Sequence, residues 1–369
     1  MNQLNTISFA ASSKLISSVL KNEIRELSPA YFALVMATGI VSIAAHLLEM
    51  EFIAVTLFIL NNIFFALLWV LNILRLVWFS KEVVGDMTNH IKGVGFFTAV
   101  AGTCILGTQY ILMFENFNIA LILLVFGTIL WVFLTYTIFT ALTIKQDKPS
   151  LGEGITGAWL TAIVATQSVA ILSALVATHM QQPYRIEVNF FALSMWLWGG
   201  MFYIWMISLI FYRYTFFKFS PDDLAPPYWI NMGAMAISTL AGSLLIINSP
   251  DAPFLQSLLP FMKGFTVFYW ATGTWWIPML IILAIWRHVI KRYPLKYDPL
   301  YWGAVFPQGM YTVCTLRMAQ ALNIHFLHAI YDVFIYIALF AWLLTFIGLL
   351  NSFRSGYIKL KHQIISLKN

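Results

Sequence analysis

Residues 156–178 read TGAWLTAIVATQSVAILSALVAT, and residues 190–212 read FFALSMWLWGGMFYIWMISLIFY. Each stretch is apolar and long enough to cross a membrane as a helix. The first contains 13 Gly, Ala, Ser, Thr or Cys residues, whereas the second contains five. Small residues let helices approach closely in lipid, and large aliphatic or aromatic side chains suit a surface that faces lipid. The pair therefore predicts an inner helix followed by an outer helix.

The same contrast repeats along the chain of 369 residues, which is 60% hydrophobic and only 10% charged. Ten apolar segments are predicted to span the membrane, at residues 29–48, 53–79, 93–113, 117–142, 156–178, 190–212, 228–248, 264–288, 301–322 and 329–350. The odd-numbered segments contain 47 small residues and the even-numbered ones contain 27. The sequence thus predicts an all-α integral membrane domain at 29–350, between an N-terminal tail (1–28) and a C-terminal tail (351–369).

The placement of charge predicts the orientation of the chain. The formal net charge is +6, and 18 of the 21 Lys and Arg residues fall in the two tails and in or beside the loops on one side of the predicted spans. Cytoplasmic loops carry this excess of basic residues, so both tails are expected in the cytoplasm. The basic charge follows from topology and indicates a bilayer as partner, not a nucleic acid. Residues 1–28 form either a helix lying on the cytoplasmic face or a partly ordered tail.

A weak repeat supports five helical hairpins. Each odd segment begins with aromatic residues, and PAYFALVMATGIVS (29–42) resembles PPYWINMGAMAIS (226–238). Five equivalent hairpins predict a quasi-fivefold arrangement, with the odd helices in an inner ring around a channel and the even helices in an outer ring. The alternative is that interfacial aromatic residues recur in any membrane protein.

Uncharged polar residues on the odd segments are candidates to line that channel, because weak hydrogen bonds let a solute pass without tight binding. These candidates are Thr38, Ser42, Thr103, Thr166, Gln167, Ser168, Ser238, Thr239, Gln308 and Thr312. The alternative for each hydroxyl is a hydrogen bond to its own helix or to a neighbouring one.

Arg317 lies deep within a predicted span, about 24 Å from the cytoplasmic start of that span. It could attract an anion, or it could be neutralised by Asp332 at the start of the last span. His325 and His328 lie near Asp332, but without a Cys partner or an H-E-x-x-H pattern they are better explained as a helix cap. We therefore expect no metal site and no cofactor; a membrane-embedded redox enzyme is the remaining alternative.

Phe306 precedes Pro307 in the same span, where a proline can kink the helix. A large ring beside such a kink could project into the channel and block it. Considered from its chemistry alone, Phe306 is more simply a residue that packs between helices, as most of the 31 Phe residues must.

Three stretches resemble the tellurite-resistance/dicarboxylate transporter family: MATGIVS (36–42), ATGTWWIP (271–278) and WGAVFPQGMYTVCTLR (302–317). That family includes tellurite-resistance permeases, fungal malate permeases and sulfite pumps, and slow-type anion channels. The resemblance implies a homotrimer of quasi-fivefold rings that transports small anions, either C4-dicarboxylates such as malate or inorganic anions; sulfite or tellurite efflux is an alternative. It also implies that Phe306 and Pro307 form the pore gate. The short tails are typical of a bacterial plasma membrane protein.

Overall fold

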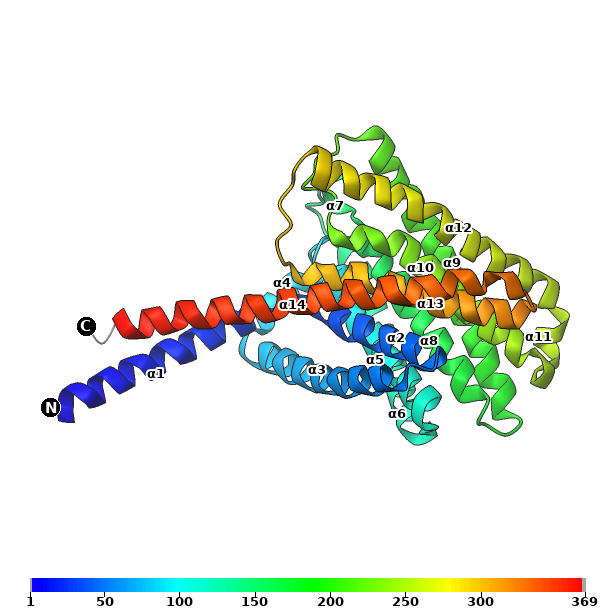
Figure 1. The fold of residues 1–369 in the computed structure, drawn as a ribbon, viewed down its shortest axis with the longest axis horizontal. Helices are drawn as coiled ribbons and strands as arrows, with labels where there is room; N and C mark the ends of the chain where they lie inside the picture. The colour runs from blue at the N-terminus through cyan, green and yellow to red at the C-terminus, as the bar shows by residue number, and fades with distance from the viewer. Residues whose placement is uncertain (1, 367–369) are drawn as a thin grey trace.

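A computed structural model describes residues 2–366, with side chains from residue 14 onward, and this part of the chain is helical with no strand. The α-helices are α1 (Asn2–Arg25), α2 (Ala33–Leu47), α3 (Glu51–Trp78), α4 (Ser80–Met87), α5 (Phe97–Phe114), α6 (Phe117–Ile144), α7 (Leu151–Gly154), α8 (Thr161–Ala177), α9 (Tyr184–Phe216), α10 (Ile230–Asn248), α11 (Pro253–Ser257), α12 (Leu259–Ile285), α13 (Trp302–Leu322) and α14 (His328–Ser366). Figure 1 shows them as one bundle of long helices, with α1 and the end of α14 extending beyond it.

Nine helices within residues 2–366 are long and apolar enough to cross a membrane. The remaining predicted span, residues 301–322, is α13, whose 21 residues cover roughly 30 Å. Gln308, Arg317 and Gln320 make α13 more polar than the other nine. The ten-span prediction is therefore matched by nine helices, and for α13 it stays a prediction.

The long helices fall into two groups by burial. In α2, α5, α8 and α10, 78–94% of the residues in the most apolar stretch are buried, compared with 22–39% in α3, α6, α9, α12 and α14. α13 belongs to the first group, because its side chains from Val305 to Leu316 are all buried. We call α2, α5, α8, α10 and α13 the inner helices and the other five the outer helices. The contrast in small residues between the odd and even segments thus corresponds to a contrast in burial.

The inner helices contact one another in a definite order. α2 packs on α5, α5 on α8, α8 on α10, α10 on α13, and α13 packs on α2. Each is preceded by a short 3-10 turn: Pro29–Phe32, Gly93–Phe96, Gly157–Leu160, Pro226–Trp229 and Pro299–Tyr301. We call these the entrance turns, and they contact one another in the same order as the helices that follow them.

The chain ends depart from the predicted boundaries. α14 runs on from the last predicted span to Ser366, so most of the segment 351–369 continues that helix. α1 contacts α3 and α14, and it extends alongside the C-terminal part of α14 at the same end of the bundle (Figure 1).

Candidate functional site

The orientation of α13 is fixed by three side chains that contact the outer helices. The Tyr311 hydroxyl lies 2.7 Å from Oγ1 of Thr274 on α12, and Oγ1 of Thr315 accepts a hydrogen bond of 3.0 Å from Nε1 of Trp270, also on α12. Gln308 lines a groove between α12 and α14. These contacts define the outward face of α13.

Phe306 precedes Gln308 by two positions, which corresponds to a rotation of about 200° around the helix axis. Phe306 therefore lies on the opposite face of α13. Its side chain is 0% exposed. Arg317 follows eleven residues later, which is about three turns and 16 Å along the axis, so it falls on the same face as Phe306. Met310 and Val313, both buried, lie between them. We call Phe306, Met310, Val313 and Arg317 the inner stripe of α13.

Glycines hold α13 close to both of its inner neighbours beside Phe306. A Cβ atom added to Gly233 of α10 would lie 2.7 Å from Cγ of Pro307. A Cβ atom added to Gly309 would lie 3.0 Å from Cγ2 of Ile40 and 3.3 Å from the backbone N of Val41, both on α2. Real Cβ atoms essentially never approach another atom to 2.7 Å, and contacts of 3.0–3.3 Å are unusually tight. Glycine at these two positions therefore permits the close approach of α13 to α10 and α2 beside Phe306.

Four of the polar candidates point toward outer helices. Oγ1 of Thr38 accepts from Nε1 of Trp342 on α14 at 3.0 Å, and Oγ1 of Thr166 accepts from Nε1 of Trp131 on α6 at 2.8 Å. Oγ of Ser42 donates to the backbone O of Ala54 on α3 at 2.8 Å, and Nε2 of Gln167 donates to the backbone O of Trp196 on α9 at 3.0 Å. These groups join inner helices to outer ones, and a pore-lining role for them stays a prediction.

The other hydroxyl candidates donate to their own helix. The acceptors are carbonyl groups three or four residues earlier, for Thr103, Ser168, Ser238, Thr239 and Thr312. Such bonds use the O–H donor of the hydroxyl and leave its oxygen able to accept further hydrogen bonds. They do not decide whether these residues contact a solute.

Arg317 has a different partner from the one considered from the sequence. Its Nη1 donates to Oε1 of Gln320 at 2.9 Å, and no ion pair joins it to Asp332 within residues 14–366. Without a carboxylate beside it, the partly buried guanidinium keeps its positive charge available at the end of the inner stripe.

The five entrance turns converge on a cavity of about 240 Å³, which the sequence did not reveal. Every turn contributes at least one residue to its lining, among them Pro29, Gly95, Gly157, Pro227 and Leu300. We call this cavity the vestibule. Helix N-termini carry partial positive charge and free N–H groups, and five of them point to this end of the bundle. The Pro and Gly residues at the start of each odd segment were the available sequence signal.

The charged side chains of the vestibule are partly neutralised. Asp86 lines the cavity and forms ion pairs with Nη2 of Arg75 and, at 3.1 Å, with Nζ of Lys92. Within residues 14–366, no group of three or more His, Cys, Asp or Glu side chains is arranged to hold a metal ion. The vestibule thus lies at the end of the bundle where the inner helices begin, and the inner stripe of α13 runs away from that end toward Arg317.

Comparison with known proteins identifies the class of protein as a membrane transporter or channel for anions. Residues 26–350 match the sequence model of the family described as voltage-dependent anion channel. The chain belongs to this family, which confirms the resemblance drawn from the three sequence stretches. It is a multi-pass membrane protein that transports anions, not an enzyme.

Three relatives show the range of the family. An uncharacterized transporter of Methanocaldococcus jannaschii is 25% identical over 352 residues, covering 91% of this chain and 98% of the relative. An uncharacterized membrane protein of Mycobacterium tuberculosis is 38% identical over 149 residues, covering 40% of this chain and 75% of the relative. A sulfite efflux pump of Arthroderma benhamiae is 22% identical over 346 residues, covering 86% of this chain and 88% of the relative.

Proposed function

We propose that small anions cross the membrane through the centre of a quasi-fivefold ring formed by the five inner helices, with α13 as the tenth span. The observation that carries the proposal is the closed order of contacts, α2–α5–α8–α10–α13–α2, together with the position of Phe306 on the face of α13 opposite its outward contacts. The entrance turns repeat that order, which supports a central pathway that begins at the vestibule.

The orientation we propose places the vestibule and both chain ends in the cytoplasm. The tails and the loops at the vestibule end carry 18 of the 21 Lys and Arg residues, and cytoplasmic loops carry such an excess. Arg317 then lies near the outer mouth, about 24 Å from the inner start of its helix. We place the protein in the plasma membrane of a bacterium, because a membrane protein of Mycobacterium tuberculosis is among its relatives.

The preference for anions follows from charge at both ends of this path. The vestibule presents the positive ends of five helices beside the side chains of Glu26, Asp86 and Lys92, and the other mouth presents Arg317. No Asp or Glu lies on the inner stripe, whereas cation channels use rings of acidic side chains. We propose C4-dicarboxylates such as malate, or inorganic anions, as substrates. The relative named as a sulfite efflux pump favours sulfite as the second candidate; tellurite efflux is a further alternative.

Phe306, supported by Pro307, is proposed as the gate of this path. A fully buried ring on the inner stripe excludes water and ions by filling the space between inner helices. Pro307 removes one backbone hydrogen bond at this point and packs on Gly233 of α10, so the helix can bend where the ring is attached.

The test is anion flux into liposomes, measured for malate, succinate, chloride, nitrate and sulfite. We expect Phe306→Ala to raise flux of the preferred anion by about tenfold or more, which corresponds to about 1.4 kcal/mol removed from the barrier. Phe133→Ala on the lipid-facing side of α6, where the ring is 57% exposed, is the matched control and should leave flux unchanged. Equal flux through the wild-type protein and the folded Phe306→Ala variant would show that Phe306 is not the gate.

The family resemblance also suggests a homotrimer, and exposed apolar side chains on the outer helices give copies a surface for contact. The mass of the protein in detergent or nanodiscs, measured by light scattering or mass photometry, distinguishes a trimer from a monomer.

A further inference from the structure

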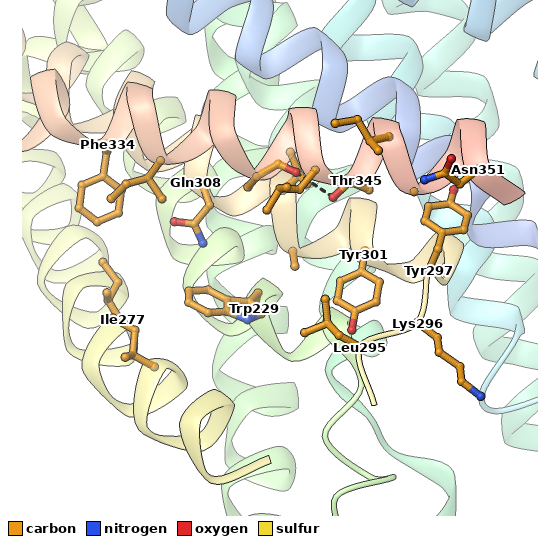
Figure 2. A pocket seen from close by; sticks show the side chains of 18 residues that line it. Trp229, Ile277, Leu295, Lys296, Tyr297, Tyr301, Gln308, Phe334, Thr345 and Asn351 are labelled. Atoms are coloured by element: carbon orange, nitrogen blue, oxygen red, sulfur yellow. Dashed lines mark hydrogen bonds between the residues drawn. The ribbon is translucent and has the colours of Figure 1, made fainter. Parts of the chain in front are cut away.

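A groove of about 590 Å³ lies on the outside of α13, between α12 and α14. Its walls are aliphatic, with Ile277 and Ile281 on α12 and Ile337 and Leu344 on α14. Figure 2 shows that the side chains labelled at one end are apolar apart from Gln308, whereas Lys296, Tyr297 and Asn351 gather at the other end. The groove is therefore amphipathic along its length, apolar at membrane depth and polar toward the entrance turns.

The buried wall of the groove holds one polar group without a partner. Gln308 is 6% exposed, and its side chain makes no hydrogen bond to any residue within 14–366. An amide in an apolar environment without a hydrogen bond is costly. The groove thus contains a donor and an acceptor that an occupant could satisfy.

Next to the polar end lies a buried arginine that also lacks a partner. Arg287 is 8% exposed, on the π-helical turn Trp286–Ile290 that ends α12. Its guanidinium makes no ion pair or hydrogen bond within residues 14–366, and its centre lies 4.2 Å from the ring centroid of Tyr293. The other two buried arginines, Arg75 and Arg213, each pair with a carboxylate.

Arg287 and the groove belong to one region. Arg287 lines a small cavity of about 50 Å³, which shares Trp229, Tyr301 and Ala304 with the groove. Lys296 lines the groove itself and adds a second positive charge. A buried cation without a counter-ion carries a large desolvation cost, so this region is complementary to an anionic group attached to an apolar chain.

A second groove shows that this combination is not general on the surface of the protein. It has a similar volume of about 640 Å³ and lies between α9 and α12, lined by residues such as Ile207, Phe211 and Trp275. No Lys or Arg lines it. The two grooves differ in charge more than in size, and only the first offers an anion a binding partner.

We propose that the groove between α12 and α14 binds one anionic phospholipid, with the phosphate at Arg287 and an acyl chain along the aliphatic walls. Basic pockets between membrane helices recognise anionic headgroups in this way. Lys296 adds to the attraction of the headgroup, and the acyl chain extends from there toward the end of the groove that holds Gln308. The site lies on α13, two residues from Phe306, so its occupant contacts the helix that carries the inner stripe.

The experiment uses the full-length protein stripped of lipid in detergent and titrated with phosphatidylglycerol, phosphatidylcholine of the same chains, or inorganic phosphate, with bound molecules counted by native mass spectrometry. We expect one phosphatidylglycerol to bind more tightly than phosphatidylcholine. Arg287→Gln should weaken that binding by about tenfold. Arg287→Lys should keep part of it. Lys291→Gln, a neighbouring exposed charge that does not line the groove, is the matched control and should leave binding unchanged.

A second pair of variants tests the apolar part without touching the charge. Ala341→Trp should fill the groove and displace phosphatidylglycerol, whereas Ser208→Trp in the uncharged groove should not. Equal binding of the two lipids would mean an unselective crevice and overturn the proposal. Binding of phosphate alone, or dissociation of an oligomer by Ala341→Trp without any loss of bound lipid, would also overturn it. The readout is lipid binding, so it stands apart from the flux measurement.

Discussion

The neighbouring helices α8 and α9 pack on each other yet differ in almost every property. In α8, 94% of the most apolar stretch is buried, compared with 39% in α9. The buried helix contains the hydroxyls and the Gln167 amide, and the exposed one presents large side chains such as Trp198 and Trp205. In lipid, polar groups need hydrogen-bond partners within the protein, whereas apolar side chains can face the lipid directly. The buried helix of this pair is therefore the one rich in small and polar residues, and the exposed helix is the one rich in large apolar residues.

The strongest way to test the contrast is to place the same large side chain on each kind of surface. Gly309→Leu on α13 would press on Ile40 and on the backbone of Val41, and we expect a loss of about 3 kcal/mol in stability. Gly264→Leu on α12 meets no atom within 4 Å and should be nearly neutral. Unfolding monitored by thermal shift or by chemical denaturation compares the two. Similar losses for both variants would contradict the division into inner and outer helices.

A smaller effect is expected from a polar side chain of α3 that reaches inward. Nδ2 of Asn61 donates to Oε1 of Gln109 on α5 at 2.6 Å, and both residues are fully buried. Asn61→Leu would leave the Gln109 amide unpaired, at a cost of about 1–3 kcal/mol. Asn72→Leu, on the same helix, loses only a bond to the backbone of Leu68 and should cost much less. An equal loss of stability in the two variants would show that the hydrogen bond between Asn61 and Gln109 contributes no more than a bond within α3.

The smallest effect is expected where an outer tryptophan donates to an inner hydroxyl. Trp342→Phe removes the hydrogen bond to Thr38, and such bonds in membrane proteins contribute about 0.6 kcal/mol on average. Trp205→Phe changes a ring that is 56% exposed and whose nitrogen has no partner within residues 14–366, so stability should not change. The single variant Thr38→Val and the double variant Trp342→Phe/Thr38→Val complete a double-mutant cycle. A coupling energy of zero would show that this hydrogen bond does not contribute to stability.

The sequence predicted the two groups of helices but not the direction of their side chains. Small-residue content separates the odd from the even segments because close packing and lipid contact select different side chains. The rotation of each helix depends on partners far away in the chain: Trp342, which donates to Thr38, lies 304 residues beyond it. Local pattern could therefore single out Thr38, Ser42, Thr166 and Gln167 as polar groups of inner helices, but it could not reveal their hydrogen-bond partners on outer helices.

The candidate gate and the buried cation illustrate the same limit. Phe306 could be singled out only through its neighbour Pro307 and a family resemblance, since nothing in its own position distinguishes it from other Phe residues. The partner of Arg317 proved to be Gln320, three residues away on the same helix, instead of Asp332 on the next. In the sequence, Arg287 is one of four basic residues in or beside the same loop, and nothing in the pattern distinguishes it from the other three. Its lack of a hydrogen-bond or ion-pair partner is visible only in three dimensions.

The vestibule has one further consequence, which concerns how such a protein can diverge. The partial positive charge of its helix ends comes from the main chain at the start of five helices, so no single side-chain replacement can abolish that contribution as long as the entrance turns keep their shape. Under the proposed mechanism, the general preference for negative charge is inherited with the backbone. The choice among individual anions is left to side chains, and relatives sharing only about a quarter of their residues have room to specialise.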